Sequence, residues 1–335
     1  MSLRAIIVII LVLAVGWSGY WWVNAGLRRD AVETWFAERQ ADGWVADYGD
    51  LRVTGFPNRV DTILTDVQLA DPGSGWSWEA PRFELLTLSY RPFEIIAVWP
   101  GRQVFASPWQ RVEVEGEVLR ASLAVSANGA FELQRSRIEG RQVQIDSSAG
   151  WALEVPVLAV ATEVPEGTSD AALQRLGITV EDMAVSGDLR RSIDPAGLLP
   201  ERVDSLHLDA TATFAAPLSL RTLEQDLPPV DALSIADVSA VWGQLDLRAQ
   251  GELEADARGY AQGNLDLRAR NWEQMLELAV ANGVLDEGTA RAASFGLGLL
   301  AAAGGDRNTL DAPLSFRDGQ TRLGPLGLGS APRLR

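Results

Sequence analysis

Apolar and polar residues alternate with a period of two along most of the chain beyond its first forty or so residues. Residues 206–214 are the clearest case, and residues 119–125 and 153–161 follow the same pattern, with Val155 and Val157 expected on one face. This period is typical of strands that bury one face and expose the other. Gly, Asn and Pro separate the strands, which favours an antiparallel sheet over parallel βαβ units.

The N-terminal segment differs because it is apolar without interruption. The 19 residues from Ala5 to Val23 carry no charge, and about 20 apolar residues suffice to cross a hydrocarbon core of about 30 Å. Trp17 and the aromatic residues at 20–22 are of the kind that settles at lipid headgroups. A cleaved signal peptide is the alternative, but its apolar run is usually only about 7 to 15 residues long. We therefore expect a retained transmembrane helix.

The charges beside this segment do not decide its orientation, because Arg4 precedes it and Arg28 and Arg29 follow it. Long domains are exported regardless of nearby charges, and one N-terminal span before a large globular region is the ordinary layout of an inner-membrane protein that faces the periplasm. We expect this location.

The same patterns predict the domain organisation. We expect an anchor over residues 1–27 and a β-rich periplasmic domain over residues 28–335, either as one elongated sheet or as two lobes, 28–165 and 166–335. Residues 30–40 have apolar side chains at helical spacing and a glycine beyond them, so they predict a short amphipathic helix after the span. The predicted fold class is α+β, mostly β, with a long curved antiparallel sheet and a few short helices.

An internal repeat predicts neighbouring strands. Residues 243–249 read GQLDLRA and residues 263–269 read GNLDLRA, with residues 253–257 alternating between them. Three adjacent strands of a meander would give this spacing. The charged positions of the repeats are expected on the wet face, as solvated ion pairs: Asp246, Arg248, Asp266 and Arg268.

Helical periodicity returns near the C-terminus. Asn271 and Asp286 are candidate caps of two helices that end near residues 282 and 304. The uncharged residues 292–305 are too few for a second membrane span and are expected to pack on the sheet. Residues 309–316 and 321–328 predict two final strands.

One region holds more apolar residues than a half-buried sheet requires. Between residues 83 and 99 the apolar residues do not keep a strict alternation, so we expect this region to be buried on both faces. Its residues, with two nearby tryptophans, either line a lipid-facing groove or form a core. They are Trp76, Trp78, Phe83, Leu86, Leu88, Tyr90, Ile95, Val98 and Trp99.

Composition excludes several kinds of chemistry. The chain has no cysteine, one histidine (His207) and, because all 29 basic residues are arginine, no lysine. Disulfide scaffolds, Cys/His zinc sites and lysine-dependent catalysis are therefore excluded. The net charge of −16 has the wrong sign for nucleic acid. We expect no catalytic, metal-binding or cofactor-binding residues, and no cofactor.

Five short blocks resemble a known bacterial family. They read Gly55-Phe56-Pro57-Asn58-Arg59, Leu69-Ala70-Asp71-Pro72, Trp76-Ser77-Trp78-Glu79-Ala80-Pro81, Leu88-Ser89-Tyr90-Arg91-Pro92 and Ala97-Val98-Trp99-Pro100, and residues 312–325 are similar to the closing motif of that family. The family is catalogued as domain of unknown function 2125. The resemblance implies an envelope protein with an N-terminal anchor and no assigned activity. The glycine-punctuated strands are also similar to AsmA-like envelope proteins, whose curved sheets are thought to shield lipid tails, which is an analogy of fold.

Three functions follow as expectations. The first is a non-enzymatic envelope protein whose apolar sheet face shelters or transfers lipid, or assists outer-membrane maintenance, with phospholipid as its partner. The second is a membrane-anchored scaffold with a filled core that binds another envelope protein. The third is a carboxylate-based periplasmic hydrolase, which is disfavoured because no pair of acidic residues stands out.

Overall fold

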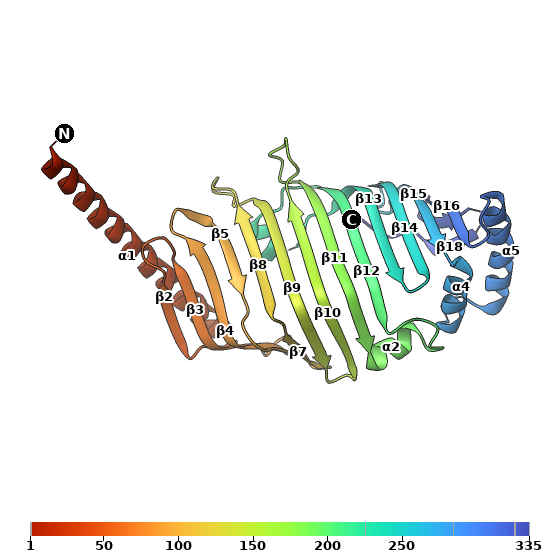
Figure 1. Ribbon diagram of the computed structural model, residues 1–335, viewed down its shortest axis with the longest axis horizontal. Coiled ribbons are helices and arrows are strands. Elements are labelled where there is room, and N and C mark those ends of the chain that lie inside the picture. Colours follow the sequence, from red (N-terminus) through yellow and green to blue (C-terminus); the bar gives the residue numbers. More distant parts are fainter. Residues whose placement is uncertain (1, 225, 284, 325, 335) are drawn as a thin grey trace. The chain divides into compact units, whose positions relative to one another are not determined.

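The computed structural model describes residues 2–224, 226–283, 285–324 and 326–334 (Figure 1). Contacts along the chain divide it into two compact units. Unit 1 holds the residues up to Ala124 together with Ser147–Ala149, and unit 2 holds Val125–Asp146 and the chain from Gly150 onward. The predicted bounds of the anchor, the domain and the two lobes stay a prediction.

Unit 1 consists of one long helix and an antiparallel sheet. Its elements are α1 (Leu3–Ala41), β1 (Val45–Asp47), β2 (Asp50–Thr54), β3 (Asp61–Asp71), β4 (Trp76–Leu88), β5 (Arg91–Val98), β6 (Gln103–Ala106), β7 (Arg111–Glu115) and β8 (Val118–Val125), which ends at the boundary. Strand β3 pairs with β1, β2 and β4, and β4 pairs in turn with β5 and β6. Strand β8 pairs with β5, and β7 pairs with β6.

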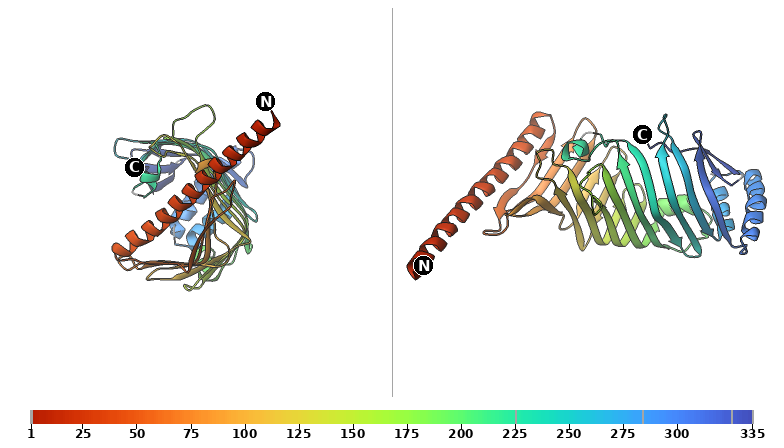
Figure 2. Two further views of the ribbon diagram at one scale, coloured as in Figure 1. Left: turned by 90° about the vertical axis from the view of Figure 1, so that its left-hand side faces the viewer. Right: turned by 90° about the horizontal axis from the view of Figure 1, so that it is seen from above.

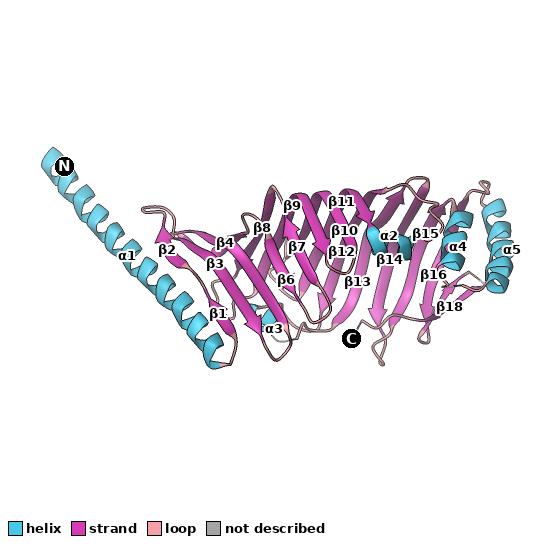
Figure 3. Ribbon diagram, turned by 90° about the horizontal axis from the view of Figure 1, so that it is seen from below, coloured by secondary structure: helices cyan, strands magenta, loops and turns pink. Residues whose placement is uncertain are grey.

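Helix α1 runs without a break through the predicted span and the predicted amphipathic helix (Figure 3). The expectation of a separate helix over residues 30–40 is therefore wrong. The residues that join the two segments contain no proline, and their one glycine is Gly26. A helix interior tolerates a glycine at a cost of about 1 kcal/mol. The helix is long and apolar enough to cross a membrane, and at 1.5 Å per residue its 39 residues measure about 58 Å.

The C-terminal part of α1 packs on the sheet of unit 1. Phe36 is buried there against the edge of the Tyr48 ring, with the two ring centroids 4.8 Å apart. The remaining buried members of this cluster come from β1 to β4 and are Ala46, Leu51, Leu64, Val67 and Ala80. Helix α1 therefore covers the apolar face of these strands.

Three aromatic side chains of α1 also donate hydrogen bonds to loop carbonyls of unit 1. The indole nitrogen of Trp17 lies 2.9 Å from the oxygen of Pro57, and that of Trp21 lies 2.6 Å from the oxygen of Arg59. The hydroxyl of Tyr20 lies 2.9 Å from the carbonyl oxygen of Ser89. Residues 17–21, at the end of the apolar run, are thus part of the folded unit.

Unit 2 is an antiparallel meander with short helices. Its strands are β9 (Leu133–Ser147), β10 (Trp151–Glu163), β11 (Leu173–Ser186), β12 (Arg202–Phe214), β13 (Val230–Trp242), β14 (Leu245–Ala255), β15 (Ala261–Arg270), β16 (Thr309–Arg317), β17 (Gln320–Leu323) and β18 (Leu326–Ser330). Its helices are α2 (Gly187–Ile193), α3 (Leu220–Glu224), α4 (Trp272–Ala281) and α5 (Glu287–Ala303). Each strand pairs with the next along the chain. Figure 2 shows that this sheet is curved.

The side chains of β10 change faces at Pro156. Val155 is buried, whereas Val157 is 37% exposed. In the pairing of β10 with its neighbours, Pro156 falls opposite Gln142 of β9 and Asp182 of β11, and both of these residues have a positive φ. The expectation that Val155 and Val157 share a face is therefore wrong, because a left-handed residue in each neighbouring strand interrupts the alternation of side chains.

The two sequence repeats form a hairpin. They lie in β14 and β15, which pair directly, and residues 253–257 are the end of β14 and the following turn instead of a strand between them. The expected meander of three strands over these residues is thus wrong. The predicted strand over residues 321–328 is divided between β17 and β18, and Pro325, the last residue of the closing motif, lies outside the described residues.

Helices α4 and α5 cover the apolar face at the C-terminal end of the sheet, as the uncharged residues 292–305 predict. Trp272 of α4 and Leu297 of α5 are buried in one cluster with Leu310 of β16. Asp286 caps α5 by accepting a hydrogen bond from the amide of Thr289. The fold class is confirmed: a mostly β, α+β protein with a long curved antiparallel sheet and an apolar N-terminal helix.

The segment that holds α2 closes one end of the strands. The side chain of Asp194 is fully buried, accepts hydrogen bonds from the amides of Leu198 and Leu199, and lies 3.0 Å from the guanidinium of Arg190. Burial raises the pKa of Asp194, but these hydrogen bonds and Arg190 outweigh it, so the pKa lies below its usual range. This carboxylate holds the segment against the sheet.

Truncating Phe36 tests the packing of α1. We expect Phe36→Ala to lower the free energy of unfolding of unit 1 by about 3 kcal/mol, because it leaves a cavity among buried side chains. Trp35→Ala is the matched control, because Trp35 is the neighbouring residue and its ring is 42% exposed. It should lower the free energy of unfolding by less than Phe36→Ala does. Denaturation of the detergent-solubilised chain, followed by circular dichroism, measures both; equal losses would contradict this packing.

Removing the Asp194 carboxylate tests the α2 segment. Asp194→Ala should lower the local opening free energy by about 2 kcal/mol, seen as faster amide exchange at Leu198 and Leu199. Because the folded-state pKa is lowered, the carboxylate stabilises the segment above about pH 4, and the wild-type protein should lose protection as the pH falls through the folded-state pKa. Asp188→Ala, at an exposed carboxylate of the same segment, should leave exchange unchanged.

Candidate functional site

The nine apolar residues predicted for unit 1 do not form one surface. Trp78 and Phe83 line a cleft of about 310 Å³ with Val32, Trp35 and Phe36 of α1. Trp99 lies against Phe83, with ring centroids 5.5 Å apart. These three predicted residues come together beside the helix.

The other six lie along β4 and β5 and in the turns beside them. Trp76 is 53% exposed at the β3–β4 turn, and Tyr90 is 60% exposed at the β4–β5 turn. The rest are half-buried, namely Leu86, Leu88, Ile95 and Val98. The expectation that residues 83–99 are buried on both faces is wrong, since Phe93 and Ile96 are exposed. Whether the nine residues meet lipid stays a prediction.

A more continuous apolar surface lies in unit 2, on the sheet face that also carries α4 and α5. Cross-strand pairing joins Ile138, Val160, Ile178 and Leu208 in one row. Leu158 and Leu206 lie in the next row, on either side of Val180. We define the apolar belt as Ile138, Leu158, Val160, Ile178, Leu206 and Leu208.

The apolar belt is only partly covered. Ile138 is 41% exposed, and the other five residues are half-buried, whereas Val180 between Leu158 and Leu206 is buried. The buried clusters of the described part of unit 2 draw on β13 to β18, α4, α5 and residue 331, and do not include the belt. Since large apolar side chains in a filled core are usually almost fully buried, the belt is an open part of the sheet face.

Both ends of the strands beside the belt are closed. At one end, Trp242 donates a hydrogen bond to the oxygen of Pro200, and Arg190 of α2 lies over the Trp242 ring. At the other end, the amide of Leu133 donates to the oxygen of Leu218, and the fully buried Gln174 donates to the oxygens of Leu133 and Ala171. Hydrogen-bonded segments therefore bound the strands of the belt at both ends.

Sequence reasoning predicted the strands of the belt but did not identify it as a site. The alternation in residues 153–161 and 206–214 was the available signal. Such alternation shows which residues share a face, but not whether a helix covers that face. The helices that follow cover β14 to β16 and leave β9 to β12 open, which depends on tertiary structure.

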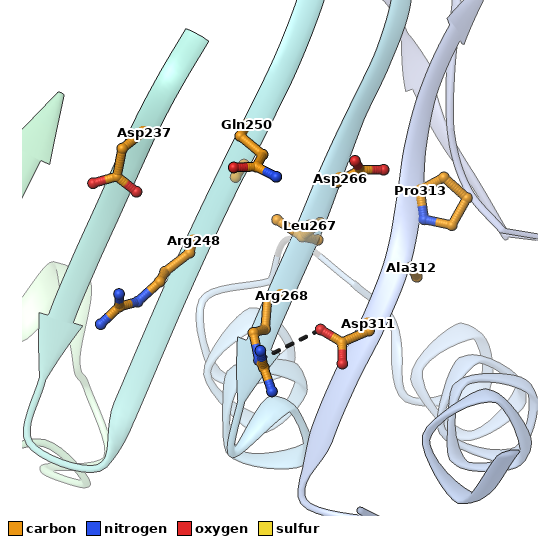
Figure 4. A pocket seen from close by; sticks show the side chains of 10 residues that line it. Asp237, Arg248, Gln250, Asp266, Leu267, Arg268, Asp311, Ala312 and Pro313 are labelled. Carbon is orange, nitrogen blue, oxygen red and sulfur yellow. Dashed lines mark ion pairs between the residues drawn. The ribbon is translucent and has the colours of Figure 1, made fainter. Parts of the chain in front are cut away.

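The opposite face of the sheet is polar. Asp246, Arg248, Asp266 and Arg268 lie on it, as predicted, and Figure 4 shows the last three of them. Arg248, Asp266 and Arg268 line a shallow hollow of about 550 Å³, in which Arg268 faces Asp311 of β16 at 3.5 Å. Arg248 pairs with Asp246 of its own strand. Both guanidinium groups are therefore neutralised by carboxylates, one within its own strand and one across to β16.

Acid–base chemistry has little support on this polar face. The Nε2 atom of His207 lies 4.0 Å from a carboxylate oxygen of Asp237. Asp209 is bound by Arg175 through two hydrogen bonds, and the bond from Arg175 lowers the pKa of Asp209. Among the described residues, no three side chains of metal-ligating type gather in one place. The open apolar belt is thus the better candidate site.

Comparison with known proteins supports the family resemblance. A family model described as an uncharacterized protein conserved in bacteria, DUF2125, matches residues 21–332. No curated protein and no solved structure matches the chain, so the similarity to AsmA-like proteins stays a prediction. The matched segment contains all five short blocks and most of both units, and on this evidence the chain belongs to the DUF2125 family of bacterial proteins.

Proposed function

We propose that this protein is a non-enzymatic component of the bacterial envelope that shelters lipid acyl chains on the apolar belt of unit 2. Helix α1 anchors it in the inner membrane, and the strands of unit 1 and all of unit 2 lie in the periplasm. The observation that carries the proposal is that α4 and α5 leave the apolar belt uncovered, while hydrogen-bonded segments close both ends of its strands. Exposed apolar surface of this kind costs about 25 cal/mol per Å² in contact with water, and an acyl chain would remove that cost.

The dimensions of the belt suit an acyl chain. Strands lie about 4.8 Å apart, so the four strands β9 to β12 present about 14 Å of apolar surface across the sheet. This is close to the thickness of one lipid leaflet, which is half of a hydrocarbon core of about 30 Å. Each methylene group transferred from water onto the belt would contribute about 0.8 kcal/mol. The polar face of the sheet offers no comparable gain.

Photo-crosslinking tests lipid binding. A photoreactive phenylalanine analogue at Leu208 should give phospholipid adducts in living cells, detected by mass spectrometry of the purified chain. His207 is the matched control, because it is the preceding residue of β12 and faces the polar side. Ile178 and Thr179, which pair with Leu208 and His207, repeat the comparison on β11.

The outcomes separate the alternatives. Lipid adducts confined to positions 208 and 178 support the proposal. A single protein adduct at these positions would contradict it in favour of the scaffold function, and equal labelling of both faces would show that the belt has no specific role.

Cysteine labelling tests the topology, because the chain contains no cysteine of its own. In intact cells, a maleimide that cannot cross the inner membrane should label Ser74→Cys in the exposed β3–β4 turn. Ser2→Cys, before the span, should react only after the inner membrane is permeabilised. The opposite pattern would place the strands of both units in the cytoplasm and contradict the proposed location.

A further inference from the structure

Two loops of unit 1 meet beside the apolar part of α1. The first joins β2 to β3 over residues 55–60, and the second joins β4 to β5 over residues 89–90 and continues into the start of β5. The amide and hydroxyl of Ser89 both donate hydrogen bonds to the oxygen of Asn58 at 2.9 Å. The two loops are thus one structural element, and we define the tip of unit 1 as residues 55–60 and 89–93.

The hydrogen bonds to α1 fix the height of the tip along the helix. Pro57 is bound by Trp17, which lies six residues before Val23, the last residue of the apolar run. At 1.5 Å per residue, this contact lies about 9 Å inside the end of that run. Ser89 and Arg59, bound by Tyr20 and Trp21, lie about 3 to 5 Å inside it.

A span that ended before these contacts would be too short. Only 12 apolar residues, Ala5 to Gly16, precede Trp17. They would measure about 18 Å, against a hydrocarbon core of about 30 Å. If α1 crosses the membrane, residues 17–21 must therefore lie at the boundary of the hydrocarbon core or within it, and the loops bound to them lie at the same depth.

The surface of the tip has the composition of a membrane interface. Phe56 is 53% exposed and Tyr90 is 60% exposed, and Phe93 at the start of β5 is 38% exposed. Aromatic side chains at this depth are favoured in the headgroup region. Arg59 and Arg91 are exposed in the same loops, where they pair with Asp61 and Glu94, and the apolar stem of each arginine can lie in the apolar layer while its charged end stays at the surface.

The backbone of the tip is also suited to a medium poor in water. An unpaired carbonyl that enters a bilayer costs several kcal/mol. Here the carbonyls of Pro57, Asn58, Arg59 and Ser89 all accept hydrogen bonds from side chains or amides of unit 1 and α1. Trp17, Tyr20 and Trp21 thus supply the donors that water supplies to ordinary loops.

We infer that the tip of unit 1 inserts into the headgroup layer of the membrane that α1 spans, so that unit 1 is seated on the bilayer instead of being tethered above it. The occupant of this surface is phospholipid. The inference rests on α1 being the membrane anchor proposed above, and it adds a second, interfacial attachment that is independent of the apolar belt of unit 2.

Depth-dependent fluorescence tests the inference on the full chain. Single cysteines at Phe56 and Tyr90 are labelled with an environment-sensitive fluorophore, and the protein is reconstituted in vesicles of phosphatidylethanolamine and phosphatidylglycerol. Leu13→Cys within the span reports insertion of α1, and Ser74→Cys, in the exposed β3–β4 turn, is the control for a solvated loop. Circular dichroism of each variant checks that it is folded.

We expect spin-labelled lipid to quench the fluorescence of the labels at positions 56 and 90. Aqueous iodide should quench these two labels about threefold less than the label at position 74. If position 13 is quenched by lipid while 56 and 90 behave like 74, the tip is not inserted, although the anchor is. If position 13 is also open to iodide, the anchor itself fails, and the inference fails with it.

Tyr90→Ser and Phe56→Ser provide a second measurement without a fluorophore. Together they should raise the accessibility of nearby Arg91 to a water-soluble arginine reagent by about threefold in vesicles, and leave it unchanged in the full chain solubilised in detergent. Equal accessibility of Arg91 in wild-type and double-variant vesicles would contradict insertion of the tip.

Discussion

The continuity of helix α1 is the constraint on which unit 1 depends. A hydrogen-bonded helix does not bend or rotate freely at one residue, so its apolar N-terminal part and its packed C-terminal part are coupled as one rigid rod. Phe36 fixes the rotation of this rod against β1 to β4, and Trp17 and Trp21 fix its height against the loops. Any tilt of the span in a membrane would therefore be transmitted to the strands of unit 1.

Unit 2 depends on a different balance. Its ten described strands carry one apolar face, and the helices that could cover that face follow β15, late in the chain. Because α4 and α5 are short, they reach only the strands nearest to them, and the earlier strands keep their apolar residues partly exposed. The contrast within one sheet is informative: Leu310 is buried beneath α5, whereas Leu208 on the same face is half-buried.

The sequence predicted the fold well where one pattern dominated. Alternation located β8, β10 and β12, and the capping residue Asp286 located the start of α5. Asn271 does precede α4 as expected, but its side chain makes no capping hydrogen bond. It failed where a single residue changed the local geometry or where a tertiary contact was decisive. The alternation in β10 did not reveal that Asp182 and Gln142 have a left-handed backbone. The aromatic residues at 17–21 predicted an interfacial belt, but not their hydrogen bonds to Pro57 and Ser89. The candidate site depends on which strands the helices leave uncovered, and no local pattern encodes that.

The prolines within the strands also have a consequence for strand register. A meander of similar alternating strands has several near-equivalent pairings, because a slip of two residues keeps every side chain on its own face. Pro156 has no amide hydrogen, and both residues opposite it have a left-handed backbone. If β10 slipped by two residues, Pro156 would lie opposite a residue in the extended conformation, and the carbonyl of that residue would lose its hydrogen-bond donor. Pro81 opposite Asp66 repeats the arrangement in unit 1. Each proline therefore favours the native strand register over registers shifted by two residues.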